Sequence, residues 1–124
     1  MHTALKTVVT AASTVLLAGA VLVIPTTVLA GDDASVLEEG KKISFDRKKG
    51  NCLACHMIAG GELPGNIGPP LIAMKARFPD KAMLREQISD ARIKNPNTIM
   101  IPFGPHGVLT PEEIDKVTEF IYSL

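Results

Sequence analysis

The pentapeptide Cys-Leu-Ala-Cys-His at residues 52–56 constrains this chain more than any other feature. It holds both cysteines of the protein, Cys52 and Cys55, followed directly by His56. The pattern C-x-x-C-H is the attachment signature of c-type haem. Each thiol can add to one vinyl group of a single haem, and the histidine then lies under the iron as the proximal ligand. The motif therefore predicts one covalently bound haem c, with His56 as an axial ligand.

Two other chemistries use a C-x-x-C pair. A thioredoxin-type redox centre needs a βαβ surround, and the sequence has no sign of one. A structural zinc site needs four ligands, usually supplied by a second cluster. No further cysteine exists, and His106 is the only other histidine beyond residue 30. Haem attachment explains the motif better than either alternative.

The N-terminal segment has the composition of an export signal. Lys6 provides a short positive region, residues 8–24 are mainly Val, Leu, Ala and Ile, and Val-Leu-Ala at 28–30 fits the small-residue cleavage rule. A transmembrane anchor is the alternative, but the apolar run is short for a span and contains Thr and Ser. We expect residues 1–30 to be a cleaved signal peptide, so that Gly31 begins a periplasmic protein without stable membrane insertion.

Residues 31–124 are then too few for more than one domain. A chain this short buries only a marginal core and usually needs an additional stabilising group. The haem would be that group, because helices can pack against its large apolar surface. Lys6 is the only charged residue before residue 31, so the net charge changes from 0 for the whole chain to about −1 after its removal. Nucleic acid is therefore not an expected partner.

Hydrophobic periodicity predicts three main helices and no strand. A first helix is expected over 36–48, after a short flexible lead at 31–35. A second is expected over 80–93, with a short helical piece before it at 71–76. The first and second helices are separated by the haem motif and a long loop.

The third helix has the clearest start signal. Thr110-Pro111-Glu112-Glu113 is a capping box with proline at the first helical position. The stretch at 57–70 reads as a loop rich in Gly and Pro, and a loop of this length in a small domain is usually functional. The predicted fold class is all-α, with three main helices and long loops around one haem.

The second axial ligand decides what the haem can do. A thioether raises the reduction potential and suits electron transfer, whereas an open position suits ligand binding or catalysis. The methionines beyond residue 30 are Met57, Met74, Met83 and Met100. The first adjoins the proximal histidine, and the next two fall in or near helical patterns that suit core packing. The last lies in the irregular segment 95–107, so we expect Met100 as the ligand, with His106 as its main rival.

The proximal histidine also needs an acceptor for its other ring nitrogen. Gly68-Pro69-Pro70-Leu71 is the best candidate segment because its prolines fix the chain. We predict that the Pro69 carbonyl accepts this hydrogen bond from His56. The alternative is that these prolines only stiffen the loop.

The order of helix, C-x-x-C-H, Gly-Pro loop, helix, Met loop and C-terminal helix resembles class I cytochrome c over the whole of residues 31–124. In that family the first and last helices cross closely through small and aromatic residues. The resemblance implies that Gly40 and Phe120 make this crossing. Because the spacing from Gly40 to Phe45 is longer than usual, the resemblance leaves open whether Phe45 takes part in this crossing.

A narrower resemblance is to the monohaem SoxX family of sulfur-oxidising bacteria. It is carried by Gly-Asn-Cys-Leu-Ala-Cys-His at 50–56, Leu-Pro-Gly-Asn-Ile-Gly-Pro-Pro-Leu at 63–71, Arg-Phe-Pro-Asp at 77–80 and the Asn-Pro to Pro-Phe-Gly segment at 95–104. Ile101 replaces a proline that is usual in the family. Met100 still matches the family's axial ligand.

The SoxX resemblance implies a place in an enzyme complex. SoxX pairs with SoxA, a larger haem subunit, and together they form an L-cysteine S-thiosulfotransferase that couples thiosulfate to a cysteine of a sulfur-carrier protein. This chain would be the non-catalytic subunit that passes electrons to another cytochrome, since no thiol remains once Cys52 and Cys55 bind haem. A free-standing small soluble cytochrome c is the alternative. A haem sensor or catalyst with an open sixth position is a third possibility, which Met100 disfavours.

Overall fold

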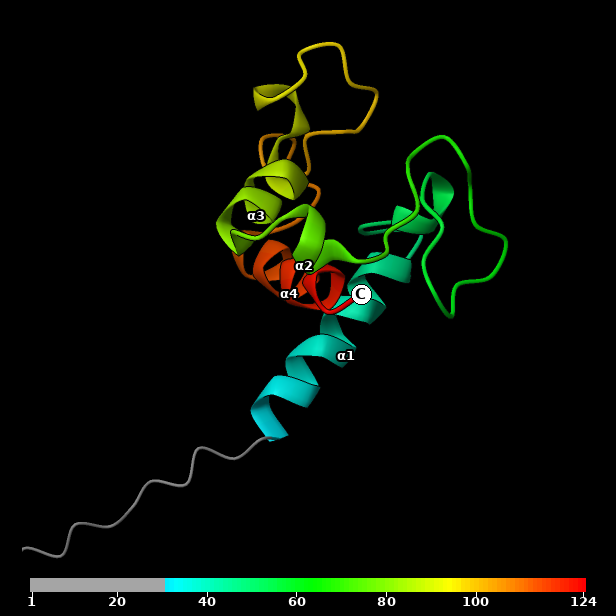
Figure 1. Cartoon of the computed structure of the whole chain (residues 1–124), viewed down its shortest axis with the longest axis vertical. Coiled ribbons are helices and arrows are strands. Elements are labelled where there is room, and N and C mark those ends of the chain that lie inside the picture. Colours follow the sequence, from blue (N-terminus) through cyan, green and yellow to red (C-terminus); the bar gives the residue numbers. More distant parts are fainter. Residues whose placement is uncertain (1–30) are drawn as a thin grey trace, which may run out of the picture.

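The computed structural model describes residues 31–124, which form helices joined by long loops and contain no β-strand (Figure 1). The elements in chain order are α1 (Gly31–Phe45), the 3-10 helix η1 (Cys52–Ala54), α2 (Met74–Arg77), α3 (Lys81–Ser89), the 3-10 helix η2 (Ala91–Ile93) and α4 (Pro111–Tyr122). The all-α prediction is confirmed for this part of the chain. The predicted signal peptide at 1–30 lies outside the described residues. None of the helices described is long and apolar enough to cross a membrane.

The predicted bounds of α1 are wrong at both ends. The helix includes residues 31–35, where the acidic Asp33 lies near the positive end of the helix dipole. It ends at Phe45 because the side chain of Asp46 accepts the Lys48 backbone N–H at 2.8 Å. Such local hydrogen bonds compete with helical ones. The charged residues at 46–48 therefore lie beyond the helix, at the start of a turn, and not within the helix as predicted.

The helix predicted over 80–93 is interrupted. The side chain of Asp80 caps α3 by accepting a backbone N–H of its first turn at 2.9 Å. Asp90 repeats this device, since its carboxylate accepts the Arg92 backbone N–H at 3.1 Å and begins η2. A side chain that caps a new turn offers the backbone an alternative to continuing the helix. The single predicted helix is thus divided into α3 and η2.

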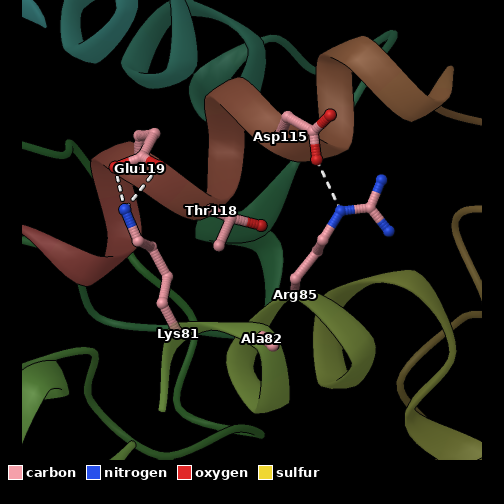
Figure 2. A pocket seen from close by; sticks show the side chains of 6 residues that line it. All are labelled: Lys81, Ala82, Arg85, Asp115, Thr118 and Glu119. Carbon is pink, nitrogen blue, oxygen red and sulfur yellow. Dashed lines mark hydrogen bonds and ion pairs between the residues drawn. The ribbon is translucent and has the colours of Figure 1, made fainter. Parts of the chain in front are cut away.

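The last helix, α4, starts as predicted and forms the centre of the core. The Thr110 hydroxyl accepts the Glu113 N–H at 3.2 Å, and the Glu113 carboxylate accepts the Thr110 N–H at 3.0 Å, which completes the capping box. The buried core contains Leu84, Ile88, Phe103, Leu109, Ile114, Val117, Phe120 and Ile121. Helix α4 packs against both α1 and α3 (Figure 1). At the contact with α3, Lys81 pairs with Glu119 and Arg85 with Asp115 around a shallow pocket (Figure 2).

Helices α1 and α4 cross at Gly40, as the class I resemblance implied. A Cβ on Gly40 would overlap the carbonyl oxygen of Lys116 and lie 2.9 Å from Phe120 Cβ, so only glycine permits this approach. Phe45, whose part the resemblance left open, also packs here, edge-on to Phe120 with ring centroids 5.9 Å apart. An exposed ion pair joins Lys116 to Glu39. Because exposed pairs contribute at most about 1 kcal/mol, packing holds this crossing together.

Two long loops project from the helical core, one (green) to the right and one (yellow to orange) above α3 in Figure 1. The first spans 57–73 and contains no helix or strand, as predicted for 57–70, and α2 begins only at Met74. The second joins η2 to α4. It is tied to α3 by a hydrogen bond from the Gly104 N–H to the Ser89 carbonyl at 3.0 Å. Both loops therefore extend from a fixed helical base.

We expect Gly40→Ala to lower the free energy of unfolding of the haem-loaded protein by about 3 kcal/mol, because the added methyl group cannot fit without separating α1 from α4. Denaturant titration measures this change. Glu38→Ala, at an exposed position of the same helix, is the control and should change the stability by less than about 0.5 kcal/mol. Equal stabilities of the two variants would contradict the close crossing.

Candidate functional site

Residues 52–56 form one tight turn. Asn51 precedes it in a left-handed conformation, with φ at 46°, which asparagine tolerates better than most residues other than glycine. After η1, the His56 N–H donates to the Cys52 carbonyl at 2.9 Å. The turn therefore brings both thiols and the imidazole together on one short segment.

Cys52 lies against the C-terminal end of α1. A Cβ on Gly50 would come within 3.3 Å of Cys52 Sγ, so glycine gives the thiol its space. Burial raises the pKa of Cys52 to about 11, and a hydrogen bond with the buried Ser44 offsets part of this rise. Redox-active C-x-x-C cysteines have lowered pKa values, so the environment of Cys52 is unlike that of a redox thiol. Ser44 is absent from the predicted site, although a serine within an otherwise apolar helix stripe is a signal that could have found it.

The side chain of His56 is oriented by Pro69. Its Nδ1 lies 2.7 Å from the Pro69 carbonyl oxygen, and this is the contact that the sequence predicted. Because a carbonyl only accepts, Nδ1 carries the proton, and in the neutral imidazole Nε2 then keeps its lone pair. Within residues 31–124, Nε2 has no hydrogen-bond partner. The imidazole thus presents the nitrogen that can bind a metal, and the other nitrogen makes the hydrogen bond that metal-binding histidines usually make.

Gly68 provides the space that the imidazole occupies. A Cβ on this residue would overlap His56 Cε1 and lie 2.6 Å from Nδ1 and 2.9 Å from Nε2. The Gly68 N–H donates to the Cys55 carbonyl at 2.8 Å, and the Gly65 N–H donates to the Leu53 carbonyl at 2.7 Å. These glycines let the loop backbone lie directly on the motif.

Met100 lies on the second loop, apart from the other predicted site residues in the sequence. Its side chain is half-buried and packs on the core, and its N–H donates to the Thr98 hydroxyl at 3.1 Å. The buried Pro102 and Phe103 anchor this part of the loop. The rival ligand His106 is exposed in the turn that follows. The structure thus brings Cys52, Cys55, His56 and Pro69 together, and it places Met100 on the second projecting loop, between η2 and α4.

The other methionines are placed as core or surface residues. Met74 is buried, and its sulfur accepts a hydrogen bond from Arg77 at 3.4 Å. Met57 and Met83 are exposed, on the first loop and on α3. Met83 was expected to fill the core, and that expectation is wrong, because α3 turns its Leu84 and Ile88 inward instead.

The two projecting loops expose large apolar side chains. They are Leu63, Ile67 and Ile72 on the first loop and Ile99 and Ile101 on the second. Clustered exposed apolar side chains mark ligand or partner surfaces. Together with two thiols and an imidazole whose Nε2 can bind iron, these residues fit a haem c group.

Comparisons with known proteins find similarity to a family and to a solved structure. Residues 38–121 match the family model described as cytochrome C oxidase, cbb3-type, subunit III. An uncharacterized lipoprotein of Aquifex aeolicus (strain VF5) is 35% identical over 101 residues, which cover 74% of this chain and 47% of that protein. This chain thus spans about half the length of the curated relative it matches. A chain in the crystal structure of SoxXA from P. pantotrophus is 29% identical, with a TM-score of 0.63, over 69% of this chain and 79% of that chain.

The fold and the site define a cytochrome c that binds haem c. The chain belongs to the cytochrome c family that the matching model describes. Within this class it is a SoxX-like class I cytochrome, because its sequence and its fold both resemble a chain of SoxXA.

We expect Gly68→Ala to displace the imidazole of His56 from the Pro69 carbonyl, because the methyl group would occupy the space of the ring. The variant should lose about 1–3 kcal/mol of stability and show a reduced fraction of low-spin haem in its absorption spectrum. Glu62→Ala, at an exposed position of the same loop outside the apolar set, should leave the spectrum unchanged. A normal low-spin spectrum for Gly68→Ala would contradict this description of the ring's surroundings.

Proposed function

We propose that this chain is a monohaem electron-transfer subunit of a SoxAX-type complex. Bound haem supplies a one-electron couple between ferric and ferrous iron. Cys52 and Cys55 would hold it through thioether bonds, and His56 and Met100 would occupy the two axial positions. The observation that carries this proposal is the hydrogen bond between His56 Nδ1 and the Pro69 carbonyl, because it leaves Nε2 available to iron.

The available side chains favour electron transfer over catalysis. A methionine thioether as sixth ligand stabilises ferrous iron and closes the position at which a substrate would bind. The half-buried Met100 lies on a loop that buried neighbours hold in place, which suits a permanent ligand. Both cysteines of the chain are spent on haem attachment, so no thiol is left to carry sulfur. We therefore assign no catalytic residue to this chain.

The likeness to SoxXA supports a SoxA-like haem protein as the partner. In that arrangement the partner couples thiosulfate to a cysteine of a sulfur-carrier protein, and this chain accepts the electrons released. It then passes them to a further cytochrome. The complex would act in the periplasm, after removal of residues 1–30 as a signal peptide.

The second candidate function is that of a free-standing soluble cytochrome c. The family match does not separate the two candidates, because the description of the family refers to an oxidase subunit and names neither a SoxA-like partner nor a free-standing carrier. The two candidates agree on the haem and its ligands. They differ in whether the chain has a stable haem-protein partner.

Met100→Ala should remove the weak far-red absorption band of a thioether bound to ferric haem and should lower the reduction potential. Met83→Ala is the matched control, because Met83 is exposed on α3, and it should keep both properties. Spectroscopy and potentiometric titration of the purified variants measure them. An unchanged far-red band in Met100→Ala would rule out Met100 as the ligand.

Purification of the tagged chain from its host grown on thiosulfate should yield a second, larger haem protein in equal amount. Haem staining after gel electrophoresis detects both proteins, and N-terminal sequencing of the smaller one should begin at Gly31. A single haem band would favour the free-standing carrier, and the proposed part in sulfur oxidation would be withdrawn. A haem-stained chain that begins at Met1 would contradict only the predicted removal of residues 1–30, and it would leave the proposed haem and partner standing.

A further inference from the structure

The segment 68–71, which carries the acceptor for the proximal histidine, is fixed by hydrogen bonds at both ends. The Gly68 N–H donates to the Cys55 carbonyl at 2.8 Å, and the Leu71 N–H donates to the Met57 carbonyl at 2.9 Å. The two residues between them are prolines and have no N–H to donate. Pro69 and Pro70 can therefore make backbone hydrogen bonds only through their carbonyl groups.

Each of these two carbonyls has a side-chain donor. The Pro69 carbonyl accepts from His56 Nδ1 at 2.7 Å, and the Pro70 carbonyl accepts from Arg77 Nη1 at 2.8 Å. The proline rings fix φ at both residues, so the direction of the Pro69 carbonyl depends mainly on its ψ. Holding the Pro70 carbonyl in place restricts that rotation.

Arg77 is itself attached to the core. It is the last residue of α2, and its Nη1 also contacts the sulfur of Met74 at 3.4 Å. Met74 is only 1% exposed, and its N–H donates to the Leu124 carbonyl beyond the end of α4 at 3.1 Å. A continuous series of contacts thus runs from α4 through α2 to the Pro70 carbonyl.

We propose that Arg77 is a positioning residue for the proximal imidazole. Its guanidinium holds the Pro70 carbonyl, and this keeps the Pro69 carbonyl aimed at His56 Nδ1. The inference rests on the proposed role of His56 as a haem ligand. The hydrogen bond at Nδ1 sets the orientation and basicity of a metal-bound imidazole, so Arg77 influences the haem without contacting His56.

The test is the solvent exchange rate of the His56 Nδ1 proton, measured by NMR in the reduced, haem-loaded protein. In Arg77→Gln the exchange should become faster by on the order of tenfold, because the charge-assisted hydrogen bond to Pro70 is lost. Arg77→Lys keeps a charged donor and should give a rate between those of Arg77→Gln and the unchanged protein. Unchanged exchange in Arg77→Gln would overturn the proposal.

Lys75→Gln is the matched control, because it removes the same charge from the same short helix. Lys75 lies over the Tyr122 ring and makes no hydrogen bond to the loop, so its replacement should leave the exchange rate unchanged. If the Nδ1 proton exchanges equally faster in Lys75→Gln and Arg77→Gln, the cause is the lost charge or a less stable helix, and the proposal is overturned. If Arg77→Gln fails to load haem, an exchange rate in Arg77→Lys equal to that of the unchanged protein overturns it instead.

The same spectra separate this inference from the proposed function. If His56 does not bind haem iron, the resonances of its ring lack the large ring-current shifts of an axial ligand in the unchanged protein. If His56 binds iron and only the inference is wrong, those shifts are present and all variants exchange alike.

Discussion

The hydrogen bond between His56 Nδ1 and the Pro69 carbonyl is the interaction on which the site depends. It selects one tautomer of the imidazole and leaves Nε2 as the nitrogen that can bind iron. The loop can make this bond only because Gly68 lets its backbone lie against the ring. The prolines then present a carbonyl with no competing N–H beside it. The segment 68–70 thus determines which nitrogen of His56 can bind iron.

The helical core determines where this segment and the motif lie. Gly40 allows α1 to contact α4, and the end of α1 then places Gly50 and Ser44 against Cys52. The Lys49 ammonium lies 2.6 Å from the Glu113 carboxylate and lowers the pKa of Glu113. This ion pair joins the residues just before the motif to the first turn of α4. This exposed pair adds little stability, so the positions of the thiols follow mainly from the packing of two helices.

Features set by local chemistry are predictable from the sequence, and those set by side chains far apart in the chain are less so. The capping box at Thr110 and the Gly-Pro segment at 68–71 involve neighbouring residues of distinctive type, so both are found in advance. The end of α1 and the division at Asp90 depend on one carboxylate competing with the helix, which periodicity does not detect. The hydrogen bond from Arg77 to the Pro70 carbonyl joins the end of α2 to the loop before it, and no pattern in the sequence points to it.

Covalent haem attachment is tested most directly by the intact mass of the purified chain, combined with the spectrum of its haem in alkaline pyridine. Attachment through both Cys52 and Cys55 predicts a mass increased by one haem and a spectrum typical of a haem with both vinyl groups saturated, because each thiol forms a thioether bond. A chain with no added mass, or a haem that acid and organic solvent extract, would contradict covalent attachment. The assignments of His56, Pro69 and Arg77 would then lose their basis.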